Sequence, residues 1–147
     1  MSKLKLMTIL GTSPEIIRLS AVIKKANQVF EHILVHTGQN YDYELNEIFF
    51  KDLGLRKPDY FLSVAGKNLG ETMGGIISKS YEVISKEKPD AILILGDTNS
   101  ALSAISAKRL KVPVFHMEAG NRCWDWNVSE MINRRVVDSI ADINLPY

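Results

Sequence analysis

Apolar residues along the chain gather in short runs that alternate with longer amphipathic stretches. The main runs lie at residues 3–10, 33–36, 90–95 and 112–117, and their lengths are typical of buried strands. Between them, apolar residues recur every three or four positions, as they do along one face of a helix. This alternation predicts an α/β fold, with a doubly wound, mostly parallel sheet, helices on both faces and a strand order such as 3-2-1-4-5.

Five stretches have the helical pattern. The first opens at Thr12-Ser13-Pro14-Glu15, where Thr12 and Glu15 fit a capping box. The others are expected at about 42–53, 69–88, 98–110 and 129–140. Asn68 should start the third, since Asn68 and Glu71 fit a second capping box.

The last helix and two short strands complete the expected elements. Ser129 is expected to cap that helix. Its predicted core face consists of Ile132, Val136, Val137 and Ile140. Short strands are expected at 60–62 and 143–145, and Gly74-Gly75 inside the third helix indicates close packing rather than a ligand contact.

Length and composition favour one domain spanning residues 1–147, with no repeat or linker. The net charge is +1, which gives no electrostatic case for nucleic acid or an acidic membrane as a partner. No apolar run approaches the roughly 20 residues of a membrane span. The single cysteine, Cys123, cannot form an internal disulfide and has no metal-site spacing, and with the absence of a signal-peptide pattern this predicts a cytoplasmic protein.

Acidic residues follow two consecutive strands of the expected sheet. Asp97 comes just after the run 90–95, and Glu118 comes directly after 112–117. Ligands of open parallel sheets bind in a crevice at the carboxyl ends of the strands, so these two carboxylates are expected to meet there. Glu130, early in the last helix, is a third candidate. Burial and mutual repulsion would raise the pKa of at least one of them toward neutrality, as proton transfer near pH 7 requires.

Each candidate has a structural alternative. Asp97 before Thr98 could equally be a helix cap, and Glu130 suits the first turn of a helix through the helix dipole. Glu118 has no capping role. Arg18 and Arg122 could bind a phosphate or carboxylate, or form local salt bridges, whereas His116 within a strand suits the core.

Glycines follow most of these strands, and helices begin beside them, so backbone N–H groups are available to an anion. The dinucleotide fingerprint G-x-G-x-x-G and the phosphate-binding loop G-x-x-x-x-G-K-[ST] are both absent. A nucleotide cofactor bound in the usual way is therefore disfavoured, and no cofactor or metal is expected.

Five motifs then combine in a specific order: G-T-S-P-E at 11–15, H-T-G-Q-N-Y at 36–41, G-D-T-N-S at 96–100, H-M-E-A-G-N-R at 116–122 and S-E-M-I-N-R-R-V-V-D at 129–138. Together they resemble the N-terminal half of the non-hydrolysing UDP-N-acetylglucosamine 2-epimerase family, over essentially the whole chain. The second motif and the segment G-N-R-C are most similar to the branch that makes UDP-N-acetyl-L-fucosamine from its talosamine epimer.

The resemblance implies a Rossmann-like domain, one half of a glycosyltransferase-B-like architecture, in a homodimeric isomerase. The implied reaction inverts C2 of a UDP-2-acetamido sugar by elimination of UDP to a 2-acetamidoglycal and re-addition. The implied catalytic acids are Asp97, Glu118 and Glu130. The implied substrate-binding residues are Gly11, Thr12, Ser13, Arg18, Gln39 and Arg122.

The chain departs from the family pattern at several points. Ser13 stands where the family has arginine, Ser129 replaces a proline, and Met131 replaces a second glutamate. A hydroxyl does not replace an arginine fork beside phosphates. The family's second domain, expected to supply most UDP contacts and a catalytic histidine, would follow residue 147, so this chain alone is expected to be inactive. The alternatives are a catalytically dead domain that binds a sugar nucleotide or a partner, and half of a glycosyltransferase-B enzyme.

Overall fold

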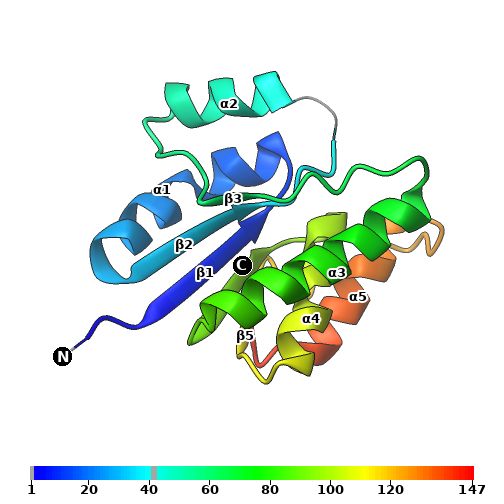
Figure 1. The fold of residues 1–147 in the computed structure, drawn as a ribbon. Coiled ribbons are helices and arrows are strands. Elements are labelled where there is room, and N and C mark those ends of the chain that lie inside the picture. The colour runs from blue at the N-terminus through cyan, green and yellow to red at the C-terminus, as the bar shows by residue number, and fades with distance from the viewer. Residues whose placement is uncertain (1, 41–42) are drawn as a thin grey trace.

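A parallel sheet forms the centre of the molecule in the computed structural model, which describes residues 2–40 and 43–147 (Figure 1). Over those residues the sheet has six strands in the order β3-β2-β1-β4-β5-β6. The strands are β1 (Lys5–Leu10), β2 (Glu31–His36), β3 (Tyr60–Phe61), β4 (Ala91–Leu95), β5 (Val114–Met117) and β6 (Ile143–Leu145). The predicted fold class and the order 3-2-1-4-5 are confirmed, and β6 extends the sheet at one edge.

The register of the strands fixes where the chain leaves the sheet. Leu95, the last residue of β4, pairs with Met117, the last residue of β5. Asp97 and Glu118 therefore emerge from neighbouring strands at the same edge. The interior of β1 and β4 is fully buried, as expected for strands that carry helices on both faces.

Helices cover the two faces of the sheet in separate layers (Figure 1). One face carries α1 (Ser13–Val29) and α2 (Tyr43–Asp52) over an apolar cluster that includes Leu10, Leu34 and Leu95. The other carries α3 (Leu69–Glu87), η1 (Asn99–Leu102), α4 (Ser103–Arg109) and α5 (Ser129–Ile140). The helix predicted at 98–110 thus begins as a 3₁₀ turn, η1, before it becomes α4.

Helix caps differ in part from the prediction. Asn68 caps α3 as expected, because its Oδ1 accepts from the Glu71 N–H at 2.9 Å. Thr12 makes no side-chain cap to α1, so that half of its predicted capping box is wrong. Ser129 is the first residue of α5 rather than its cap. The cap position is occupied by Val128, which makes no side-chain hydrogen bond to the helix. Asp42, a possible start of the second helix, lies outside the described residues.

The buried face of α5 agrees with the predicted one only in part. Val137 is buried, and Val136 and Ile140 pack against the core, as predicted. Ile132 is 58% exposed, so its assignment to the core was wrong. The buried residues of this helix are Met131, Asn133, Arg134 and Val137. The rotation of the helix turns an arginine, rather than an isoleucine, toward the end of the sheet.

The two glycines within α3 have different surroundings. A Cβ on Gly75 would lie 3.3 Å from the Val64 side chain, whereas a Cβ on Gly74 would meet nothing within 4 Å. Close packing, the predicted reason for both, therefore holds for Gly75 and not for Gly74.

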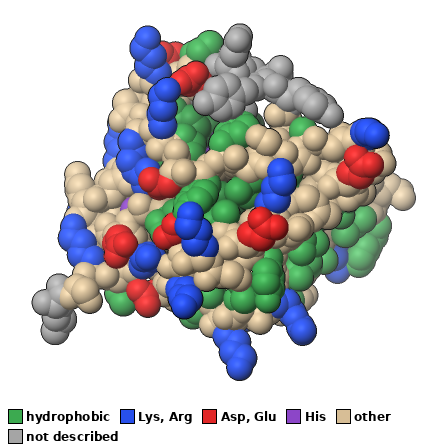
Figure 2. Space-filling model, in the orientation of Figure 1, with side chains coloured by type: hydrophobic (Ala, Val, Ile, Leu, Met, Phe, Trp, Pro, Cys, Tyr) green, Lys and Arg blue, Asp and Glu red, His purple; other side chains and the backbone are tan. Residues whose placement is uncertain are grey.

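Charged side chains of both signs are interspersed on the face of the molecule drawn in Figure 2, in keeping with the net charge of +1. In the part of the chain that the structure describes, no helix is both long and apolar enough to cross a membrane.

Candidate active site

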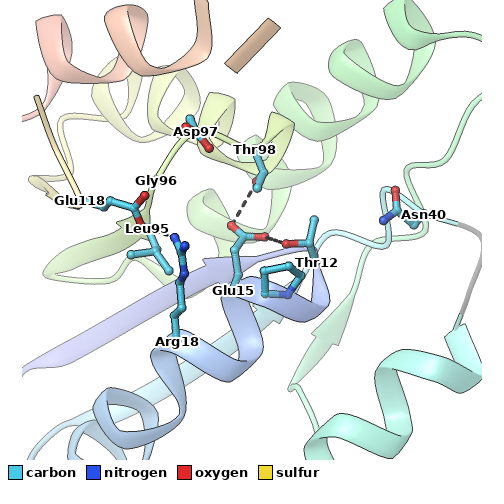
Figure 3. A pocket seen from close by; sticks show the side chains of 10 residues that line it. Thr12, Glu15, Arg18, Asn40, Leu95, Gly96, Asp97, Thr98 and Glu118 are labelled. Atoms are coloured by element: carbon cyan, nitrogen blue, oxygen red, sulfur yellow. Dashed lines mark hydrogen bonds and ion pairs between the residues drawn. The ribbon is translucent and has the colours of Figure 1, made fainter. Parts of the chain in front are cut away.

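A crevice of about 420 Å³ opens at the carboxyl edge of the sheet, where β1, β4 and β5 end (Figure 3). Side chains and backbone from the loops after these strands and from the first turns of α1 line it. The lining residues are Thr12, Pro14, Glu15, Arg18, Asn40, Leu95, Gly96, Asp97, Thr98 and Glu118. The site lies where ligands of open parallel sheets bind.

Asp97 and Glu118 meet at this crevice through a shared arginine. The buried Arg134 of α5 donates from Nη2 to the Asp97 carboxylate, and the same nitrogen lies 3.4 Å from Glu118 Oε1. Its Nη1 donates to the Glu118 backbone carbonyl. A buried guanidinium therefore contacts both acidic side chains and fixes their separation.

Glu118 has an unusual backbone conformation and a second cationic partner. Its φ is +61°, in the left-handed region that residues other than glycine seldom adopt. Arg18 of α1, whose side chain is exposed, donates from Nη1 to Glu118 Oε2 over a distance of 2.6 Å. The Glu118 carboxylate is thus aimed into the crevice by a strained turn and held between two arginines.

Glu15 is a third carboxyl at the crevice, and the sequence indicated it only as part of a helix start. Its side chain points between the loops after β1 and β4 (Figure 3). The Gly11 N–H and the Thr12 hydroxyl donate to its Oε2, both at 2.9 Å, and the Thr98 hydroxyl donates to its Oε1 at 3.1 Å. Burial raises the pKa of Glu15 to about 7, although these hydrogen bonds act in the opposite direction.

A buried histidine supports the loops from behind. His116 Nε2 lies 2.6 Å from the Gly96 carbonyl, and His116 Nδ1 lies 2.9 Å from Asp138 of α5. Asp138 also accepts from the Gly120 N–H at 3.1 Å. His116 and Asp138 thus link the turn before Asp97 to the turn after Glu118. His116 is fully buried, so the expectation that it belongs to the core is confirmed.

Some predicted substrate-binding residues lie behind the crevice rather than in it. Thr12 and Arg18 line it, and Ser13 begins α1 beside it. A Cβ on Gly11 would come within 2.1 Å of the Ser100 and Thr37 hydroxyl oxygens, so Gly11 makes room for protein atoms. Gln39 Oε1 accepts from the Ser100 N–H and hydroxyl and so joins two loops.

The remaining predicted residues lie outside the lining of the crevice. Glu130 is exposed at the start of α5, where it accepts from the Ser129 hydroxyl at 2.9 Å. Arg122 forms an ion pair of 2.6 Å with Asp138. Their roles in binding and catalysis stay predictions. Across residues 2–40 and 43–147, no group of three or more His, Cys, Asp and Glu side chains is placed to hold a metal ion.

The fold and the crevice define the class of protein: a Rossmann-like α/β domain with candidate acid–base groups at the carboxyl edge of a parallel sheet. Residues 23–147 match the family model described as UDP-N-acetylglucosamine 2-epimerase. The chain belongs to this family, as the sequence motifs predicted.

Known relatives agree with this membership. UDP-2,3-diacetamido-2,3-dideoxy-D-glucuronate 2-epimerase from Pseudomonas aeruginosa is 43% identical, over 95% of this chain and 40% of its own length. A solved UDP-N-acetylglucosamine 2-epimerase from Rickettsia bellii is 60% identical with a TM-score of 0.91, over 98% of this chain and 38% of that one.

A third comparison includes ligands. The Methanocaldococcus jannaschii UDP-GlcNAc 2-epimerase, solved in complex with UDP-GlcNAc and UDP, is 40% identical with a TM-score of 0.89. The match covers 94% of this chain and 39% of the Methanocaldococcus jannaschii chain. The chain thus spans about 40% of the length of the curated relatives that it matches.

Proposed function

We propose that this chain supplies the acid–base half of the active site of a UDP-2-acetamido-sugar 2-epimerase. The reaction would interconvert a substrate such as UDP-GlcNAc and its C2 epimer, or a related 6-deoxy-L-sugar pair. The observation that carries the proposal is the convergence of Asp97 and Glu118 on Arg134 in one open crevice. Membership of the epimerase family supports the choice of reaction.

Inversion at C2 needs proton transfer on both faces of the sugar ring. In the proposed first step, one carboxylate removes the C2 proton while the C1–O bond to UDP breaks, which gives a 2-acetamidoglycal and UDP. In the return step a second acid delivers a proton to the opposite face of C2 as a phosphate oxygen of UDP bonds to C1. Asp97 and Glu118 are the proposed base and acid, since two groups from separate strand ends can approach a ring from different sides.

Further residues are needed to complete such a site. The crevice is open, and neither Glu130 nor Arg122 lines it. The proposal therefore includes a second Rossmann-like domain that closes over the crevice in a glycosyltransferase-B-like arrangement and brings Glu130 into use. It also includes assembly as a homodimer and a cytoplasmic location, where a nucleotide sugar would be the substrate.

A chimaera tests this proposal directly. This chain is fused to the remaining segment of the Methanocaldococcus jannaschii relative, and the product is incubated with UDP-GlcNAc in D₂O. We expect epimerised sugar that carries deuterium at C2, and no turnover by this chain alone. Epimerised product without deuterium would contradict the elimination mechanism, and an inactive chimaera beside an active parent enzyme would contradict the proposed activity.

Substitutions in the chimaera assign the roles. Asp97→Asn and Glu118→Gln are each expected to lower kcat by about 100-fold or more, because each removes a group that exchanges a proton with the substrate. Asp125→Asn, in the exposed loop before α5, is the matched control and should leave the rate unchanged. Equal effects of all three substitutions would argue against the assignment.

A catalytically inactive domain that binds a sugar nucleotide is the second candidate function. Ser13, where the family has arginine, favours it, because a serine hydroxyl cannot form a bidentate contact with phosphate. Under this alternative the chimaera binds UDP-GlcNAc without turnover, and Ser13→Arg leaves it inactive. A large gain of activity in the Ser13→Arg chimaera would exclude the alternative.

A further inference from the structure

The crevice carries more carboxyl groups than guanidinium groups. Glu15, Asp97 and Glu118 line it, and the facing cations are Arg18 of α1 and Arg134 of α5. With all five ionised the group has a net charge of −1. If the proposed function holds, the diphosphate of a UDP-sugar adds two further negative charges. Binding such a ligand is therefore favoured by any change that removes a negative charge from the crevice.

Asp97 and Glu118 already have cationic partners in the crevice. Asp97 contacts the guanidinium of Arg134, and Glu118 contacts those of Arg134 and Arg18. The negative charges of both carboxylates are thus matched by arginines in direct contact.

Glu15 differs from them in the kind of partner it has. Its hydrogen-bond donors within the described part of the chain are uncharged: the backbone N–H groups of Gly11 and Thr12 and the hydroxyls of Thr12 and Thr98. A hydroxyl can donate or accept, so the Thr98 hydroxyl can turn to accept a hydrogen from a protonated Glu15 Oε1. Glu15 can therefore take up a proton without losing its contacts. Its side chain is 3% exposed, and burial raises its pKa to about 7.

The position of Glu15 links its charge to anion binding. It lies in the first turn of α1 and takes the Gly11 N–H, so its negative charge occupies the end of the helix that otherwise favours anions. The same carboxyl joins the loop after β1 to the loop after β4, the two loops that form one wall of the crevice (Figure 3).

We propose that Glu15 is a proton-linked ligand-binding residue, so that the crevice binds the diphosphate of its UDP-sugar with Glu15 protonated and takes up a proton on binding. This inference rests on the proposed function. It makes Glu15 a positioning residue whose charge state sets the affinity for a dianionic ligand, separate from the proton transfers at C2.

Calorimetric titration of this chain with UDP-GlcNAc tests the inference. Both phosphates of this probe are esterified, so its own charge stays constant near neutral pH. At about pH 8 the binding enthalpy should depend on the ionisation enthalpy of the buffer, with an uptake approaching one proton. Between about pH 6 and pH 8 the Kd should rise by about tenfold, since Glu15 changes from largely protonated to largely ionised in the free protein.

Two glutamine variants make the result specific. Glu15→Gln keeps the size of the side chain and removes its charge, and it should bind at pH 8 as tightly as the unaltered chain binds at pH 6, with no proton uptake. Glu71→Gln is the matched control, because Glu71 is also the third residue of its helix, α3, but does not line the crevice. It should retain the proton uptake and the tenfold pH dependence.

Failure of the inference and failure of the proposed function are distinguishable. Binding with the same proton uptake in the Glu15→Gln variant, or with no uptake in the unaltered chain, would overturn the role of Glu15 alone. Absence of UDP-GlcNAc binding at every pH from about 6 to 9, both by this chain and by the chimaera that supplies the second domain, would overturn the proposed function, and the inference with it.

Discussion

Arg134 illustrates how one buried side chain can define a site. It is 5% exposed and contacts the carboxylate of Asp97, the carboxylate of Glu118 and the Glu118 carbonyl. Without it, two carboxylates at the ends of neighbouring strands would lack their common cationic partner. The geometry of the proposed acid and base therefore depends on an arginine that belongs to neither strand.

Replacement of Arg134 by methionine should cost both stability and activity. Methionine keeps much of the volume but leaves Asp97 and Glu118 without their common counter-charge, so we expect a loss of about 3 kcal/mol in the free energy of unfolding. Urea unfolding of the two proteins would measure it. The matched change, Arg109→Met at the exposed end of α4, should alter stability by less than about 0.5 kcal/mol. Similar losses for both variants would contradict the role given to Arg134.

Glu15 should also leave a signature in the pH dependence of stability. Its pKa of about 7 in the folded chain is above the ordinary value of 4.5, so the folded chain binds this proton more tightly than the unfolded chain does. The ionised buried carboxyl therefore destabilises the fold above pH 7, and this destabilisation disappears as the pH falls toward 4.5. The difference in the free energy of unfolding between the Glu15→Gln variant and the unaltered chain should therefore shift in favour of the variant by up to about 3 kcal/mol from pH 4.5 to pH 8.

The comparison with the variant separates Glu15 from the histidines. Burial lowers the pKa values of His32 and His36 to about 4, so both destabilise the fold as the pH falls from about 6.5. The effect of the histidines on stability is opposite to that of Glu15. It is present in both the unaltered chain and the Glu15→Gln variant, so it cancels when their free energies of unfolding are subtracted. Urea unfolding across this pH range would measure that difference, and parallel pH profiles would contradict the assignment.

At this scale the sequence predicted the carboxylates and a salt bridge as one role of Arg18, but not the second arginine, Arg134, that contacts them. Asp97 and Glu118 were found because each directly follows a strong strand pattern. Arg134 was missed because the predicted core face of α5 was drawn from apolar residues alone. The spacing of Met131, Arg134 and Val137 was the available signal. The alternation of apolar residues cannot show that an arginine will be buried, since its counter-charges come from distant strands.

At the scale of elements, the two glycines of α3 offer a clean comparison. Gly74→Ala adds a Cβ where nothing lies within 4 Å, so the higher helix propensity of alanine should stabilise the protein by about 0.5–1 kcal/mol. Gly75→Ala gains the same propensity, but its Cβ would press on Val64 at 3.3 Å, and the net effect should be smaller or unfavourable. Thermal unfolding of the two variants measures the difference, and equal effects would contradict this account of the packing.

Elements were predicted well where a local pattern determines them. The parallel strands and the Asn68 cap follow from short-range chemistry, and both are confirmed. The start of α1 at Thr12-Ser13 is also confirmed, but the side-chain cap was wrong, because the Thr12 hydroxyl donates to Glu15 rather than accepting from the helix backbone. Glu15 also accepts from Thr98 of the distant loop after β4, a contact that a local pattern cannot show.

At the scale of the whole molecule, the sheet should have a gradient of stability from its centre to its edge. Met7, Ile9, Ile92 and Ile94 of β1 and β4 are at most 1% exposed, whereas Ile143 of β6 is 44% exposed. In amide hydrogen exchange we expect β1 and β4 to exchange only through global unfolding, and β6 to exchange much faster. Fast exchange in β1 would contradict this ordering of the sheet.

The turn at Glu118 has a consequence for how the protein can change. A left-handed backbone costs a residue other than glycine about 1 kcal/mol, and Gly96 and Gly120 nearby adopt the same region without that cost. Glycine at position 118 would relax the loop while deleting the proposed catalytic carboxylate. The backbone conformation at this position therefore favours glycine, whereas the proposed reaction and the buried guanidinium of Arg134 both require a carboxylate there.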